Sequence, residues 1–121
     1  DLETDSGRIT SFAIAPSPTF AGVVDLHAFS GGPLVPLLWL YNLLEKKKLP
    51  VVMHNATYDL TYLDLYGIRP RGKVEDTMLM HHAMQPESEK SLGFLASIYC
   101  NEFAFKTLRK KAQKDINKRY E

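Results

Sequence analysis

The chain has 121 residues, of which 45% are hydrophobic and 24% are charged, and its formal net charge at pH 7 is +1. This length and composition are sufficient for one globular domain with its own core, and they exclude an intrinsically disordered chain. The near-neutral charge does not by itself call for a polyanionic partner, so any argument for nucleic-acid binding must come from the local distribution of charges.

The single cysteine, Cys100, lies in an apolar run and has no second cysteine with which to form an internal disulfide. It suits a reducing compartment, where we expect it to pack as a small hydrophobic side chain. No stretch of sequence reaches the ~20 apolar residues of a membrane helix, and no signal peptide is visible. We therefore expect a soluble, cytoplasmic protein with no membrane partner.

The first part of the chain has the pattern of three antiparallel strands. Asp1 to Glu3 is followed by a polar turn, and residues 8–15 then have the length and β-branched content of a second strand. The prolines that follow are expected to break this strand, and residues 22–29 offer a third.

The second part alternates helical patterns with short apolar strands. A helix is predicted from residue 34 to about residue 44, and a buried strand at 51–53 passes directly into a helix that ends near Gly67. A short strand near Val74 precedes a third helix, which Asp76 and Thr77 are expected to cap, and residues 91–99 form a fourth. This order predicts an α/β fold, in which a mixed sheet of three antiparallel strands and then parallel strands is flanked by helices.

Two acidic residues, Asp1 and Glu3, stand on either side of Leu2 at the start of the chain. Side chains alternate along a strand, so these two carboxylates would share a face at a separation of ~6 to 7 Å. Like charges at this distance repel each other unless a cation or a proton neutralises them, which makes the pair a candidate metal site. The alternative is a solvated surface pair.

A third candidate carboxylate lies where the apolar strand at 51–53 enters its helix. Asn55 and Asp59 are four residues apart, so on a helix they would share a face that points toward the end of the sheet. The alternative is that Asn55 only caps the helix and that Asp59 only complements the helix dipole.

These segments, in this order, resemble a known family. Asp1 to Thr4, and Asn55 to Asp59 after an apolar strand, are similar to the first and second motifs of the DEDD-type 3′→5′ exonucleases, which have a ribonuclease H-like fold. A third block, residues 74–97, resembles the proofreading exonuclease domain of family A DNA polymerases, particularly the phage-like ones. The resemblance spans most of the chain.

The resemblance implies a role for each matching residue. Asp1, Glu3 and Asp59 correspond to catalytic carboxylates that hold two divalent cations, Mg²⁺ or Mn²⁺, for hydrolysis of the 3′-terminal phosphodiester of DNA. The residues that correspond to contacts with the terminal nucleotide are Thr4 and Asn55, with Tyr58 as a further candidate. The implied partners are the 3′ end of single-stranded DNA and the polymerase domain of a parent chain, in the cytoplasm, including a host cytoplasm if the gene is carried by a phage.

The match to the family departs from its pattern at two places. The family needs a fourth carboxylate with a tyrosine four residues before it, and Tyr120 could be that tyrosine only if an Asp followed Glu121. Gly7 stands where many relatives carry an apolar residue that wedges against the terminal base. We expect residues 1–121 to be one partial exonuclease domain, truncated at both ends, that lacks the start of the first strand and the third motif and is inactive alone.

Two other functions remain open at this stage. One is a ribonuclease D-like exonuclease that acts on RNA 3′ ends, although the block after Asp76 argues against it. The other is a non-catalytic domain of the same fold that only holds single-stranded nucleic acid or supports a polymerase.

A basic stretch lies near the end of the chain. It could be either a solvated helix or a segment that binds phosphate groups. Its basic residues are Lys106, Arg109, Lys110, Lys111, Lys114, Lys118 and Arg119.

Overall fold

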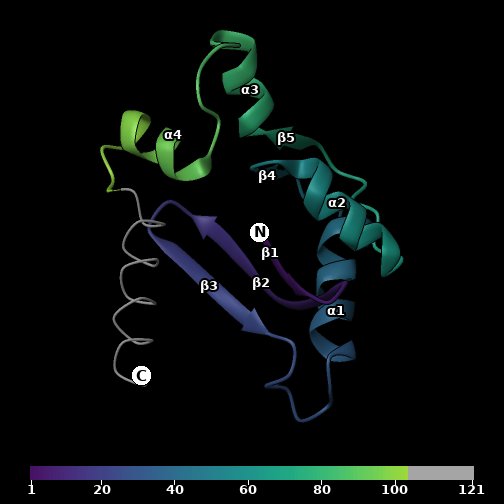
Figure 1. The fold of residues 1–121 in the computed structure, drawn as a ribbon. Helices are drawn as coiled ribbons and strands as arrows, with labels where there is room; N and C mark the ends of the chain where they lie inside the picture. Colours follow the sequence, from purple (N-terminus) through teal and green to yellow (C-terminus); the bar gives the residue numbers. More distant parts are fainter. Residues whose placement is uncertain (104–121) are drawn as a thin grey trace, which may run out of the picture. The chain divides into compact units, whose positions relative to one another are not determined.

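The computed structural model describes residues 1–103, so the basic stretch at 106–119 and Tyr120 lie outside the described residues. The chain forms two compact units, Asp1–Thr77 and a second unit that begins at Met78. The first unit contains five strands, two helices and one π-helical turn (Figure 1). Their bounds are β1 Leu2–Asp5, β2 Arg8–Ser17, β3 Phe20–Asp25, α1 Leu34–Tyr41, η1 Asn42–Lys46, β4 Val51–Met53, α2 Ala56–Leu65 and β5 Val74–Asp76.

The strands β1, β2 and β3 form an antiparallel sheet in that order, as the sequence predicted. The prediction that β2 ends before Pro16 was wrong, because the strand continues to Ser17. The pairing of β2 with β3 is irregular between Ile14 and Ser17, so Pro16, which has no backbone N–H, sits where no regular ladder bond is needed. The predicted extension of the third strand to residue 29 was also wrong, because β3 ends at Asp25.

A register shift between Glu3 and Thr4 interrupts the pairing of β1 with β2. Glu3 pairs with Ser11 and Thr4 pairs with Ile9, which leaves Thr10 as an extra residue on β2. The hydroxyl of Thr10 donates a hydrogen bond to the carbonyl oxygen of Glu3 at 3.1 Å. Bulges of this kind bend a strand and redirect its side chains, and this one lies directly beside the predicted site residues.

The second sheet of this unit consists of β4 and β5, which pair in parallel with Val51 opposite Val74 and Met53 opposite Asp76. The α/β fold predicted from the sequence, with antiparallel strands followed by parallel ones, is confirmed. Within residues 1–103, no backbone pairing joins this two-stranded sheet to the three-stranded one.

Gly72 lies where the chain passes close to the end of η1. A Cβ atom on this residue would lie 2.5 Å from the carbonyl oxygen of Leu49 and closer still to that of Lys48. Only glycine fits such an approach, which brings the chain before β5 alongside the chain before β4.

The first unit has one hydrophobic core, to which residues of both sheets contribute. Its buried members are Leu2, Ile9, Phe12, Leu26, Leu40, Leu44, Leu63 and Ile68, and Val51 and Met53 of β4 pack against them.

The second unit contains most of α3, Thr77–Met84, and all of α4, Leu92–Tyr99. His81 is only 2% exposed, and its two ring nitrogens lie 3.0 Å from the Tyr99 hydroxyl and 2.9 Å from the Ser88 hydroxyl. The expectation that Cys100 packs in the interior was wrong: this residue follows the last turn of α4 and is exposed. No helix among residues 1–103 has the length and hydropathy that are needed to cross a membrane.

Candidate active site

Asp1, directly before β1, and Glu3, within β1, are exposed, whereas Leu2 between them is buried. The amino and carbonyl groups of Asp1 exchange hydrogen bonds with the backbone of Ala13 on β2, at 3.2 and 2.8 Å. Burial of Leu2 in the core fixes which face of β1 points outward. Asp1 and Glu3 therefore share the outward face, as alternation along a strand requires.

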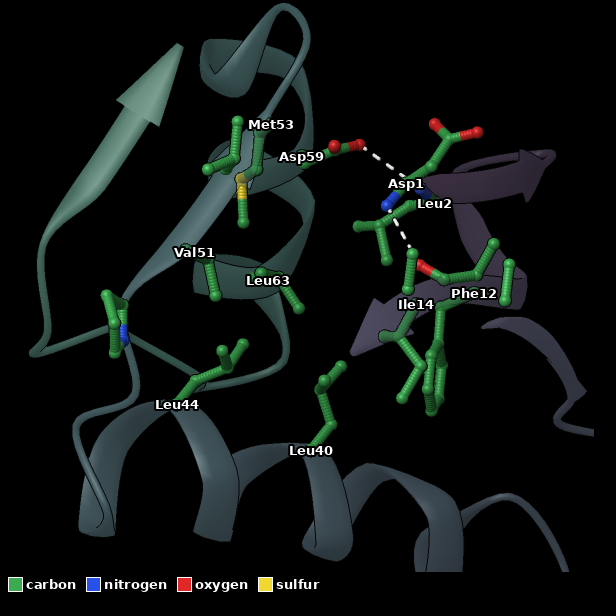
Figure 2. Close-up of a pocket in the computed structure, with 15 residues that line it drawn as sticks. Asp1, Leu2, Phe12, Ile14, Leu40, Leu44, Val51, Met53, Asp59 and Leu63 are labelled. Carbon is green, nitrogen blue, oxygen red and sulfur yellow. Dashed lines mark hydrogen bonds between the residues drawn. The ribbon is translucent and has the colours of Figure 1, made fainter. Parts of the chain in front are cut away.

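Asp59 lies in the first turns of α2 and is 3% exposed, which is unusual for a carboxylate. Its Oδ1 atom accepts a hydrogen bond from the backbone N–H of Leu2 at 3.3 Å (Figure 2). The acidic side chain from the middle of the chain thus contacts the backbone between the two acidic residues at its start. Two segments 57 residues apart in sequence meet at this point.

Burial is the main cause of the raised pKa of the Asp59 carboxyl, which has an ordinary value of 3.8. The charge of the amino terminus and the hydrogen bond from Leu2 act in the opposite direction, and the nearby Asp76 carboxylate adds a small further increase. The environment of Asp59 therefore lacks enough positive charge to balance its ionised form. A bound cation would provide that charge.

Two residues predicted to contact a nucleotide contact each other. The hydroxyl oxygens of Thr4 and Tyr58 are 2.5 Å apart, and either group can be the donor. Tyr58 is 42% exposed, and its ring centroid lies 4.9 Å from that of Tyr62 one turn later on α2. This pair joins β1 to α2 on the outer side of the Leu2–Asp59 contact and presents aromatic surface to solvent.

Asn55 adopts the left-handed backbone conformation, with φ 61° and ψ 57°, immediately before α2 begins. Its side chain makes no capping hydrogen bond to the helix, so the alternative in which Asn55 caps α2 through its amide does not describe this structure. The four-residue spacing predicted that Asn55 and Asp59 share a face of a helix. Asn55 precedes the helix and is exposed, whereas Asp59 is buried, so the two residues differ in their exposure to solvent. Left-handed residues other than glycine are uncommon and concentrate at functional sites.

The start of α2 is capped by Asp76, a residue from the end of β5. Its two carboxylate oxygens accept hydrogen bonds from the backbone N–H groups of Asn55 at 3.0 Å and Ala56 at 2.8 Å. The sequence had assigned Asp76 to the cap of the following helix, and the structure shows this carboxylate at the start of α2. A sequence signal for this contact was available, because strands were predicted at 51–53 and near Val74. If these two strands are parallel neighbours, their carboxyl ends lie at the same edge of the sheet.

A second link joins the ends of β4 and β5. The Thr77 hydroxyl donates to the carbonyl oxygen of Met53 at 3.2 Å and lies 2.9 Å from Nδ1 of His54. Because the hydroxyl hydrogen is used by Met53, the hydroxyl oxygen accepts from a protonated Nδ1 of His54. Together with the Asp76 cap, this network fixes the position at which β4 passes into α2, and so the position of Asp59.

Comparison with known proteins agrees with this geometry. Residues 1–120 match the family model of the 3′-5′ exonucleases of the DNA polymerase A type. The chain belongs to this exonuclease family. Searches of curated proteins and of solved structures gave no match.

The exonuclease family implies divalent cations, and the chemistry of the predicted ligands fits them. Asp1, Glu3 and Asp59 offer carboxylate oxygens, the donors that Mg²⁺ and Mn²⁺ prefer. Within residues 1–103, no three His, Cys, Asp or Glu side chains lie close enough together to form a complete metal site. The contact of Asp59 with Leu2 brings together the segments that carry these carboxylates, and the roles of the three residues stay predictions.

Proposed function

We propose that this chain is the proofreading 3′→5′ exonuclease domain of a family A DNA polymerase, and that its substrate is the 3′ end of single-stranded DNA. The reaction is hydrolysis of the last phosphodiester: a water oxygen bonds to phosphorus, and the bond from phosphorus to the 3′ oxygen of the penultimate nucleotide breaks. The 3′ oxygen then takes up a proton. Membership of the exonuclease family supports the reaction class, and the proofreading role and the DNA substrate are parts of the proposal.

The observation that carries the proposal is the hydrogen bond from Leu2 to Asp59. It brings a buried carboxylate to a backbone position flanked by Asp1 and Glu3. In the proposal these three residues hold two divalent cations. When bound, such cations supply an activated hydroxide and stabilise the charge on the leaving 3′ oxygen.

The chain's own residues would position the terminal nucleotide. Thr4 and Tyr58, already joined through their hydroxyl groups, form one side of the proposed nucleotide site. Asn55 adds an exposed amide, which can both donate and accept hydrogen bonds. The bulge after Glu3 and the Asp76 cap hold these side chains in place through the backbone.

The first experiment measures Mn²⁺ binding by the 121-residue chain, using calorimetry and the electron paramagnetic resonance signal of the free ion. We expect weak binding that falls at least tenfold in Asp1→Asn, Glu3→Gln and Asp59→Asn. Asp5→Asn is the matched control, because Asp5 is an exposed acid on the same strand. Equal weakening by the control would mean that the carboxylates attract ions only through their general charge.

The second experiment measures degradation of DNA labelled at its 5′ end. We propose that the 121-residue chain alone is inactive. Metal-dependent turnover by this chain would contradict that part of the proposal.

In a longer polypeptide that contains residues 1–121, Asp1→Ala with Glu3→Ala should abolish degradation while DNA binding persists. Unchanged behaviour of that variant would instead support a non-catalytic binding domain. Faster degradation of RNA than of DNA of the same sequence would support a ribonuclease D-like enzyme.

A further inference from the structure

The bulge in β2 is held from within the sheet by the side chain of its extra residue. The hydroxyl of Thr10 donates to the carbonyl oxygen of Glu3 at 3.1 Å, across the register shift. The backbone of Thr10 is also held, because its carbonyl oxygen accepts from the N–H of Leu26, directly after β3, at 3.1 Å. The Thr10 hydroxyl therefore fixes the peptide group that joins Glu3 to Thr4.

A second hydroxyl group reaches the bulge from α2. The hydroxyl oxygen of Tyr66, at the carboxyl end of this helix, accepts a hydrogen bond from the backbone N–H of Ile9 at 3.0 Å. Ile9 is the residue that pairs with Thr4 beyond the register shift, and it is only 3% exposed. A backbone N–H that is removed from water needs an acceptor, and Tyr66 supplies one from outside the sheet.

The end of α2 fixes the position of Tyr66. The helix stops at Gly67, which adopts φ 76° and donates its N–H to the carbonyl oxygen of Asp64 at 2.9 Å. The N–H of Ile68 donates to the carbonyl oxygen of Leu63, also at 2.9 Å. These two bonds form a Schellman motif. Because Ile68 and Leu63 are both buried in the core, the motif is anchored there, and Tyr66 with it.

Two side chains of α2 bond to the strands on either side of Glu3. Asp59 and Tyr66 are seven residues apart, which is about two helical turns, so they share a face of the helix. Asp59 accepts from the N–H of Leu2 at 3.3 Å, before Glu3, and Tyr66 accepts from Ile9, beyond the bulge. The backbone around Glu3 is therefore fixed relative to Asp59 at two points.

We propose that Thr10 and Tyr66 are positioning residues for Glu3. Their two hydroxyl groups hold the bulge, and the bulge sets the direction of the Glu3 side chain relative to Asp59. The hold on the bulge is independent of any ligand. Its use in the site rests on the proposed function, in which Glu3 and Asp59 hold divalent cations.

The test uses variants that remove one hydroxyl group each. Thr10→Val and Tyr66→Phe nearly keep the size of the side chain, and Thr10→Ser keeps the hydroxyl. Thr61→Val is a control, because the Thr61 hydroxyl donates to a carbonyl oxygen within α2 at 2.7 Å. Tyr41→Phe, at a half-buried tyrosine of α1, is the second control. The unfolding midpoint of each variant is measured first, and all other measurements are made well below the lowest midpoint.

The first measurement is made by NMR in the absence of metal ions. We expect Thr10→Val and Tyr66→Phe to change the chemical shifts of the backbone amide and the side-chain carboxyl of Glu3, and Tyr66→Phe to speed exchange of the Ile9 amide at least tenfold. Thr10→Ser should restore the Glu3 shifts toward those of the parent chain. Glu3 shifts in both hydroxyl-free variants that match those of the two controls would overturn the proposal.

The second measurement is the affinity for Mn²⁺. Thr10→Val and Tyr66→Phe should each lower it at least threefold, and neither should lower it further in a chain that already carries Glu3→Gln, because both act through Glu3. A loss of the same size in both backgrounds would overturn the proposal. If Glu3→Gln alone leaves the affinity unchanged, the proposed cation site is wrong, and the metal-free NMR measurement alone decides whether the two hydroxyl groups position Glu3.

Discussion

Replacement of Asp76 tests the interaction that holds α2, and with it Asp59, in place. The carboxylate of Asp76 accepts two backbone hydrogen bonds at the start of α2, at 3.0 and 2.8 Å. A hydrogen bond to a charged group contributes ~1.5 to 3 kcal/mol. Asp76 is half-buried, and water can replace part of the lost bonding after truncation, so we take the lower value for each bond. Asp76→Ala should then reduce the free energy of unfolding by ~3 kcal/mol.

Thermal and urea unfolding, followed by circular dichroism, measure this change. For a chain of this length, ~3 kcal/mol corresponds to a decrease of roughly 10 °C in the unfolding midpoint. Asp76→Asn retains one acceptor oxygen but loses the charge, so we expect its free energy of unfolding to lie between those of the parent chain and Asp76→Ala. Glu75→Gln is the matched control, because the adjacent Glu75 forms an ion pair with an exposed lysine and no cap. If Asp76→Ala and Glu75→Gln unfold at the same midpoint, the proposed role of the cap is wrong.

Three further predictions concern individual side chains. The pKa of Asp59 in the folded state is raised above its ordinary value of 3.8, so between pH 3.8 and that raised pKa the folded state keeps a proton that the unfolded state releases, and the free energy of unfolding should fall as pH rises through this range. In urea unfolding with EDTA present, Asp59→Asn should lack this fall and should match the parent chain at pH values below the range. Gly72→Ala should cost ~1 to 3 kcal/mol in thermal unfolding because its Cβ would overlap two backbone carbonyl oxygens, whereas Gly93→Ala, in open space within α4, should be neutral or stabilising, and equal effects would refute the packing argument. His81→Ala should lower stability by ~2 to 4 kcal/mol by leaving two hydroxyl partners and a cavity, while loss of the same size in the exposed His82→Ala would contradict this account.

Much of the fold could be predicted from local patterns in the sequence. The apolar strand at 51–53 and the helix after it have clear signals, because a short apolar run and a helical repeat depend only on neighbouring residues. The same holds for the turn at Ser6 and Gly7, where both residues adopt positive φ. Strand ends were predicted less well, because Pro16 is tolerated only through an irregular pairing with a partner strand that the local sequence does not reveal.

The sequence by itself determined which residues could carry the chemistry. Alternation along β1 is a property of any extended chain, so Asp1 and Glu3 had to share a face once Leu2 was buried. The order of the three motifs was likewise sufficient to indicate the exonuclease family, to which the chain belongs.

Only the tertiary structure decided what surrounds those residues. The bond from Leu2 to Asp59, the Asp76 cap on α2 and the contact of Thr4 with Tyr58 each join segments at least 20 residues apart. Such contacts depend on which strands become neighbours and on which side chains are removed from water, and no local pattern encodes either. The raised pKa of Asp59 has the same origin, because burial is a property of the packed molecule and not of the residue.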